Sequence, residues 1–264
     1  MDFFRQLVCM LSFLLMSVGL LAQKTGAITY TQVIKLDIQG IEGLDLAGIL
    51  PTDMSSSKTL YFDEGSSIYK DAEDHVDEDV EISSDDGSFE MVFSTGGEGE
   101  EILYTNLREK RVLQQTSFMG KEFLIESSLD KPKWKITKER IKYLGYVCQK
   151  ATRTDIVPPT PGSSEAAKER EVVAWFTSEI PTSIGPGDYN QLPGAVLLVS
   201  VDEGMTEIKA TAVELDVPIS EKMVLPSKGQ KVSPEEYEVI MTEKMKELEE
   251  MYNNTEGRSI MIRG

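Results

Sequence analysis

The stretch IGPGDYNQLPGAVLLVSVDEGMTEIKATAVEL, residues 184–215, decides how this chain is expected to fold. It opens with a cluster of Gly, Pro, Asp and Asn, residues that favour turns, and runs into an apolar segment at 195–201. A turn at 202–204 then separates this segment from an alternating, half-exposed one at 206–215. We predict a β-hairpin whose first strand is buried on both faces. We interpret the turn cluster as the entrance to that strand; a ligand-holding loop is the alternative.

The same strand pattern recurs along the chain on both sides of this hairpin. Alternating segments rich in β-branched and aromatic residues lie at 27–38, 59–70, 89–95, 101–107, 110–118, 121–128, 134–154 and 171–181. Short Gly-containing or charged breaks separate them, as in an antiparallel meander. A sheet of about ten strands must curl, close or split. We therefore predict a mainly β fold, a curved antiparallel sheet of half-barrel or sandwich-like form, with one C-terminal helix.

That helix is predicted at residues 233–252. Ser233 is a suitable N-cap, Pro234 suits the first helical position, and Glu236 completes a capping box. One apolar stripe follows at helical spacing, formed by Tyr237, Met241, Met245, Leu248 and Tyr252. We expect this stripe to pack on the sheet; a partner-binding helix is the alternative, because methionine adapts to varied surfaces. The segment SIMIRG at 259–264 is a candidate closing strand.

The N-terminus indicates export. A short charged start, an apolar run at residues 7–21 and the small Ala22 have the layout of a signal peptide. We expect cleavage after residue 22 and a single β-rich domain at 23–264. Two loops interrupt this domain, an acidic one at 71–87 and a Pro/Ser-rich one at 157–169. The acidic loop is expected to be solvated, with an adventitious calcium site as the alternative. A net charge of −18 argues against nucleic acid and anionic membranes as partners.

The residue inventory disfavours catalysis. The only histidine is His75, in the acidic loop, so a Ser or Cys nucleophile has no base and zinc has no ligand set. Cys148, the one cysteine of the expected mature chain, lies in a strand-like context and is predicted to be buried and unreactive. Carboxylate pairs could serve a hydrolase, but 45 acidic residues make any pair uninformative. We predict no enzyme activity, no metal and no cofactor.

Trp134 and Trp175 are the candidate ligand-stacking residues. Both lie at strand-like positions, where burial is the default, so stacking on a ligand is the alternative interpretation.

Residues 133–201 resemble the GLPGLI family of exported Gram-negative envelope proteins. The matching positions are Trp134, Ile136, Gly145, Tyr146, Cys148, Ala151, Trp175, Ile180, Pro181, Gly185, Pro186, Leu192, Pro193 and Gly194. Gln191 replaces the first glycine of the signature, and Ala195-Val196 replace Leu-Ile. Losing that glycine leaves open whether position 191 has a positive φ. The resemblance implies an exported, mostly β protein without assigned catalytic residues, and a structural turn that contains Gly185, Pro186, Tyr189, Leu192, Pro193 and Gly194.

We therefore expect a non-catalytic protein of the periplasm or the outer-membrane periphery. It would bind a partner protein or an apolar ligand, such as a lipid or lipoprotein, in a large apolar pocket on the concave side of the sheet. That expectation rests on fold-level analogy with half-barrel lipoprotein carriers. A structural or adaptor protein of an outer-membrane assembly is the alternative, and a carboxylate-based hydrolase is less favoured. The oligomeric state is left open.

Overall fold

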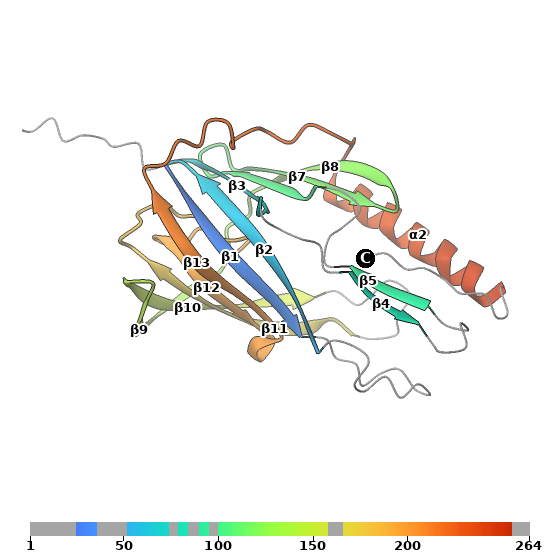
Figure 1. Ribbon diagram of the computed structural model, residues 1–264, viewed down its shortest axis with the longest axis horizontal. Helices are drawn as coiled ribbons and strands as arrows, with labels where there is room; N and C mark the ends of the chain where they lie inside the picture. The colour runs from blue at the N-terminus through green and yellow to red at the C-terminus, as the bar shows by residue number, and fades with distance from the viewer. Residues whose placement is uncertain are drawn as a thin grey trace, which may run out of the picture.

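One large curved sheet dominates the computed structural model, which describes residues 25–35, 52–73, 79–83, 90–94, 100–157 and 166–254 (Figure 1). The strands of the large sheet are β1 (Gly26–Lys35), β2 (Asp53–Phe62), β3 (Ser66–Asp71), β6 (Ile102–Asn106), β7 (Arg111–Phe118), β8 (Lys121–Ser128), β9 (Lys135–Tyr143), β10 (Tyr146–Val157), β11 (Lys168–Thr177), β12 (Ala195–Val201), β13 (Thr206–Leu215) and β14 (Gln230–Val232). A two-stranded sheet contains β4 (Asp79–Ser83) and β5 (Glu90–Ser94), and a 3-10 turn, η1 (Asp202–Gly204), joins β12 to β13. The mainly β fold class is thus confirmed.

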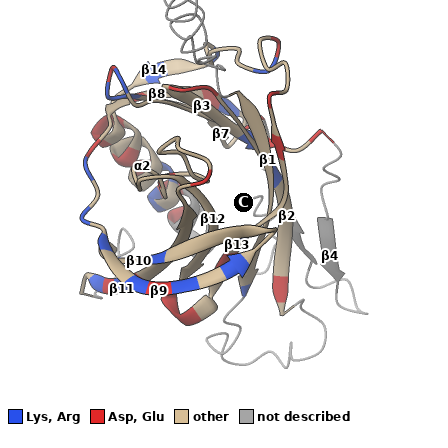
Figure 2. Cartoon of the chain, turned by 90° about the vertical axis from the view of Figure 1, so that its left-hand side faces the viewer, with Lys and Arg blue, Asp and Glu red and all other residues tan. Residues whose placement is uncertain are grey.

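The large sheet has the order β14-β8-β7-β6-β3-β2-β1-β13-β12-β11-β10-β9. Each neighbouring pair is antiparallel except β14 and β8, which are parallel. The sheet bends strongly, so that β7 and β8 lie across from β10 and β11 (Figure 2). This arrangement confirms the predicted curved antiparallel sheet and corresponds to its half-barrel form. Exposed Lys135, Lys138, Arg140 and Lys142 line the terminal strand β9, where charge discourages pairing with another sheet.

The predicted hairpin forms, and its first strand lies in the core. Residues 195–197 of β12 are all buried, as expected for a strand covered on both faces. Tyr30 of β1 donates a hydrogen bond from its hydroxyl to the backbone oxygen of Val196, at 2.7 Å. From the preceding segment, Ile180, Ile184 and Leu192 are buried in the same core cluster. The turn cluster is therefore a packed entrance to β12, as the sequence indicated.

Two glycines shape this entrance. A Cβ on Gly185 would lie 1.9 Å from the backbone oxygen of Tyr189, and one on Gly194 would lie 2.0 Å from that of Thr177. Gly194 also has a φ of +149°, a region that favours glycine. Gln191, which stands in place of the first signature glycine, keeps a positive φ of +65°. The side-chain amide of Gln191 donates to the backbone oxygen of Asp130, and this contact helps to hold the unusual backbone.

The helix α2 (Pro234–Asn254) begins as predicted. Ser233 accepts from the backbone N–H of Glu236, and the Glu236 carboxylate accepts from the N–H of Ser233, which completes the capping box. Tyr237 of the predicted stripe packs near Phe123 of β8 as expected, but Ile240, which is not part of that stripe, also packs there. Met245, expected to be buried, is 49% exposed. The helix touches the sheet only near its start, so the more distal stripe position has nothing to pack on. The side chains of residues 248 and 252 lie outside the described part.

One loop prediction needs correction. Residues 79–83, inside the expected acidic loop 71–87, form β4 and pair with β5. Val80 and Ile82 alternate with acidic residues there, so the segment keeps a strand period despite its charge. The segment predicted as a Pro/Ser-rich loop at 157–169 lies between the paired strands β10 and β11, and its end residues 157, 168 and 169 belong to those strands. Residues 1–22, 74–78, 84–89, 158–165 and 259–264 lie outside the described part, and with them the signal peptide, His75 and the closing strand. Within the described ranges, no helix is long and apolar enough to cross a membrane.

Candidate ligand-binding cleft

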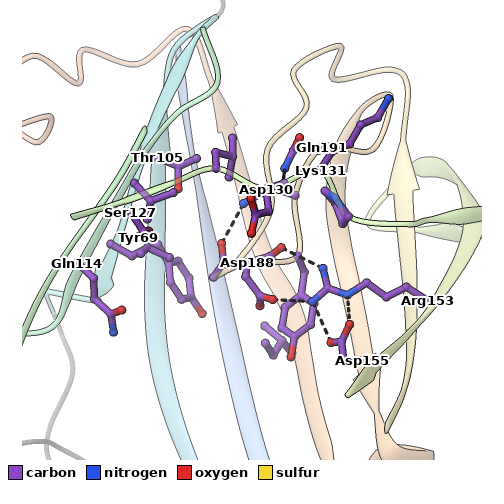
Figure 3. A pocket seen from close by; sticks show the side chains of 18 of the residues that line it. Tyr69, Thr105, Gln114, Ser127, Asp130, Lys131, Arg153, Asp155, Asp188 and Gln191 are labelled. Carbon is purple, nitrogen blue, oxygen red and sulfur yellow. Dashed lines mark hydrogen bonds and ion pairs between the residues drawn. The ribbon is translucent and has the colours of Figure 1, made fainter. Parts of the chain in front are cut away.

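The hollow side of the sheet carries an open cleft of about 910 Å³ (Figure 3). One wall comes from β2, β3, β6, β7 and β8, and the opposite wall from β10 and the loop before β12, with β1 and β13 between them. The lining residues are Gln32, Lys58, Tyr69, Glu101, Leu103, Thr105, Val112, Gln114, residues 127–133, residues 153–156, residues 187–191, Thr206 and Ile208. Because all these elements contribute from one side, the cleft occupies the concave face.

The large concave pocket expected from the sequence is thus present, but its lining is mixed. Leu103, Val112 and Ile208 provide apolar surface, whereas charged and neutral polar groups surround them. A ligand in this cleft would meet both kinds of surface.

Arg153 of β10 forms the centre of one wall. Its guanidinium lies between two aromatic rings, 4.8 Å from the centroid of Trp134 and 5.0 Å from that of Tyr189. It pairs with Asp155 at 2.9 Å and with Asp188 at 2.5 Å, and its side chain is only 7% exposed. Burial disfavours the charge, but the carboxylates of Asp188 and Asp155 outweigh burial and raise the pKa of Arg153. Aromatic and ionic contacts together fix the loop against β10.

Lys58 of β2 plays a similar part on the other wall. Its ammonium lies 2.9 Å from Asp71 and 2.8 Å from Glu101, and its side chain is largely buried. Burial alone would lower the pKa of Lys58, yet the two acids raise it overall. Each deep cation of the cleft is therefore neutralised by the protein itself.

Two uncharged polar groups of the cleft lack a hydrogen-bond partner among the described residues. The hydroxyl of Tyr69 on β3 is buried and makes no hydrogen bond within the described part of the chain, and Tyr69 is 8% exposed. Its ring extends into the cleft from the β3 side (Figure 3), and burial holds the pKa of this phenol well above its usual value. The side-chain oxygen of Asn190, a residue that is 4% exposed, is likewise unpartnered, while its amide donates to the backbone oxygen of Gly187.

The two tryptophans have different surroundings. Trp134 donates from its indole N–H to the backbone oxygen of Asn190, at 2.9 Å, and Arg153 lies over its ring. Trp134 therefore supports the cleft wall from behind and is not itself a lining residue. Trp175 is half-buried on β11 and also lies outside the lining. Neither tryptophan is thus placed to stack on a ligand in this cleft.

Cys148 is fully buried and free, as predicted. Burial, with a smaller contribution from Glu179, raises the pKa of its thiol to about 11. This cysteine is a core residue rather than a nucleophile.

The structural turn at 185–194 combines the two interpretations of this stretch, the entrance to a buried strand and a loop that holds a ligand. Leu192 and Gly194 lie in the core, whereas Tyr189 and Gln191 line the cleft. Sequence reasoning missed Lys58, Tyr69 and Arg153, because none belongs to a recognisable local motif. In the part of the chain that the structure describes, no group of His, Cys, Asp and Glu side chains is arranged to hold a metal. The acidic residues proposed for calcium lie largely outside that part.

Comparison with known proteins places the chain only coarsely. A family model described as a protein of unknown function (Porph_ging) matches residues 159–198. This range contains β11, the structural turn and the start of β12, and it overlaps only the C-terminal part of residues 133–201, on which the resemblance to the GLPGLI family rests. The match is compatible with that resemblance but covers a small part of the chain. No curated protein matches the sequence.

Among solved structures, PNGF-II has a TM-score of 0.51 and 15% identity, over 82% of this chain and 32% of that chain. This chain thus spans about a third of PNGF-II, and at this identity the likeness shows the fold alone. An uncharacterized conserved protein from Thermus thermophilus has a TM-score of 0.36 and 8% identity, over 81% of this chain and 91% of that one. LprF from Mycobacterium bovis has a TM-score of 0.27 and 10% identity, over 78% and 90%. These last two are too distant to inform function.

Proposed function

We propose that this protein is an exported, non-catalytic envelope protein that binds a ligand in its concave cleft. The observation that carries this proposal is the open cleft of about 910 Å³, a size typical of sites for small molecules or lipid portions. The apolar strip of Leu103, Val112 and Ile208 suits the apolar part of a lipid or lipoprotein, and the surrounding polar groups suit a polar end. The N-terminal sequence and the GLPGLI-like turn support an address in the periplasm or at the outer membrane of a Gram-negative bacterium.

A binding role without catalysis is the better explanation of the lining. The carboxylates beside the cleft centre, Asp155, Asp188 and Glu101, are each paired with a buried cation. A carboxylate that is held in an ion pair is poorly suited to accept or donate a proton during a reaction. The sequence also offers no histidine base outside the acidic segment.

Site-specific photo-cross-linking in the native envelope tests this proposal. A photoreactive residue replacing Gln114, inside the cleft, should form an adduct of discrete mass that mass spectrometry can identify. The matched control replaces exposed Lys209, whose neighbours Ile208 and Ala210 on β13 are buried, so its own side chain points away from the cleft. Equal adducts at both positions, or none at residue 114, would contradict a ligand in the cleft.

An adaptor role is the second candidate, and the surface of α2 favours it. Val239 and Met245 are large apolar side chains that remain exposed on this helix. Light scattering on the purified chain separates the two candidates: a stable oligomer that Met245→Glu disperses supports the adaptor, whereas a monomer at micromolar concentration supports the ligand-binding role.

A further inference from the structure

Neutral hydrogen-bonding residues outnumber charged residues in the lining of the cleft. Nine lining residues carry an uncharged hydroxyl or amide besides the two tyrosines: Gln32, Thr105, Gln114, Ser127, Ser128, Thr154, Asn190, Gln191 and Thr206. These groups come from both walls and from the strands between them. A ligand made entirely of hydrocarbon would leave these groups without hydrogen-bond partners, which is unfavourable.

The charges of the cleft centre are not available to a ligand. Lys58 is held by Asp71 and Glu101, and Arg153 by Asp155 and Asp188. A charged ligand group would have to break one of these pairs and leave a largely buried charge uncompensated. The other charged lining residues, Asp130, Lys131 and Lys133, are all exposed, so the buried free hydrogen-bonding capacity of the described lining lies with uncharged groups.

The hydroxyl of Tyr69 and the side-chain oxygen of Asn190 are the most informative of these groups. Both residues are more than nine-tenths buried, both line the cleft, and neither atom has a hydrogen-bond partner among the residues that the structure describes. Buried polar atoms are almost always hydrogen-bonded, so an unpartnered pair in one cleft calls for an explanation. The oxygen of Asn190 can only accept, which requires an O–H or N–H on the ligand, while the Tyr69 hydroxyl can donate or accept.

We infer that the cleft recognises an uncharged, hydroxyl-rich group, the chemistry of a sugar. This inference rests on the proposed function and specifies what the cleft binds. A sugar hydroxyl donates to Asn190 and exchanges a hydrogen bond with Tyr69, while Thr105, Gln114 and Ser127 offer further partners on the facing wall. Such a group has two sources, a free oligosaccharide or the head of a lipid glycoside, whose chain would lie along Leu103, Val112 and Ile208.

Binding of defined probes to the purified chain tests the inference. Isothermal calorimetry is performed with a panel of neutral oligosaccharides and the corresponding dodecyl glycosides, below their critical micelle concentrations. Dodecylphosphocholine is the matched detergent, because it has the same chain with a zwitterionic head that lacks hydroxyl groups. We expect at least one sugar probe to bind and dodecylphosphocholine to bind at least tenfold more weakly than the best glycoside. Tighter binding of the glycoside than of its free sugar identifies a lipid glycoside, and equal binding identifies a free oligosaccharide.

Two tyrosine variants separate recognition from structure. Tyr69→Phe removes a hydroxyl that has no partner among the described residues, so it should not lower the melting temperature. It should weaken sugar binding about tenfold, the effect of one lost hydrogen bond. Tyr30→Phe removes the hydroxyl that donates to Val196, so it should lower the melting temperature and leave sugar affinity unchanged. The two rings are in edge-to-face contact, which makes them a matched pair.

Three results would overturn the inference: no binding by any sugar probe, equal binding of dodecylphosphocholine, or an unchanged affinity in Tyr69→Phe. None of these results touches the cross-link expected from position 114, so failure of the sugar inference and failure of the proposed function are distinguishable.

Discussion

Substitution of Gly194 by alanine should destabilise the fold much more than the same change seven residues earlier. The new Cβ would lie 2.0 Å from the backbone oxygen of Thr177 and 2.5 Å from its carbonyl carbon. Both are backbone atoms, and they cannot move aside easily because Thr177 pairs with Ala195 in the β11–β12 ladder. The ladder itself must therefore shift.

The expected cost combines two contributions. Placing alanine at a φ of +149° costs about 1–3 kcal/mol of backbone strain. Displacing packed backbone costs a further ~1–3 kcal/mol, so the total loss of stability is about 4 kcal/mol. For a domain of this size, about 2–4 °C of melting temperature are lost per kcal/mol, so Gly194→Ala should melt about 8–16 °C below wild type.

Gly187 provides the control in the same loop. Its φ is +59°, but a Cβ there would have no neighbour within 4 Å. Gly187→Ala should therefore cost only the backbone preference, about 1 kcal/mol, or about 2–4 °C. Thermal and urea melts followed by tryptophan fluorescence measure both variants. Equal shifts in the two, or a Gly194→Ala protein within 3–4 °C of wild type by the same conversion, would refute the close-approach argument.

Three further predictions concern buried groups. With a pKa of about 11, Cys148 has about a thousandth of its thiol ionised at pH 8, against about a quarter for a free cysteine. Ellman's reagent should therefore label Cys148 only after unfolding. Prompt labelling of the folded protein would contradict its burial. Arg153→Met should cost about 2 kcal/mol in urea melts, less than for a fully buried pair because Asp188 is 70% exposed. Arg108→Met, at an exposed pair, should cost at most about 0.5 kcal/mol. Similar losses in the two variants would contradict the role of Arg153 in fixing the loop against β10. Burial raises the pKa of Tyr30 and of Tyr69 in the folded protein. Their contribution to stability is therefore fully present below about pH 10, the pKa of tyrosine in the unfolded chain, and is lost as the pH rises towards the pKa values in the folded protein. Melting temperatures between pH 9 and 12 should fall less steeply in Tyr30→Phe than in wild type.

Features with a local cause were predictable from the sequence. The strands were found by their period of two residues, and the cap of α2 by the Ser233 and Glu236 pair. The burial of β12 followed from its uninterrupted apolar run. By contrast, the packed face of α2 depends on how the helix lies against Phe123 and Ile125 of β8, so Ile240 rather than Met245 makes the contact. The spacing of apolar residues along the helix does not show which of them contact the sheet.

The cleft was predictable in position but not in composition. A curved sheet implies a concave face, which is why a pocket was expected there. The residues that define its chemistry come from separate strands, and Tyr69 and Asn190 are more than a hundred positions apart in the sequence. Their shared feature, a buried polar atom without a partner, exists only once the sheet has curled. Among 45 acidic residues, the few that neutralise Lys58 and Arg153 also carry no local mark.

The segment before β12 links the stability of the sheet to the chemistry of the cleft. Gly185 and Gly194 let this segment approach backbone so closely that Ile184 and Leu192 reach the core. The same close approach presents Tyr189 to Arg153 and places Asn190 in the cleft wall. A ligand that bonds to Asn190 would therefore stabilise the entrance to β12, and it should raise the melting temperature as well as fill the site. Strand entrance and binding wall are thus two faces of one segment, in which the glycines and buried apolar residues position the polar ones.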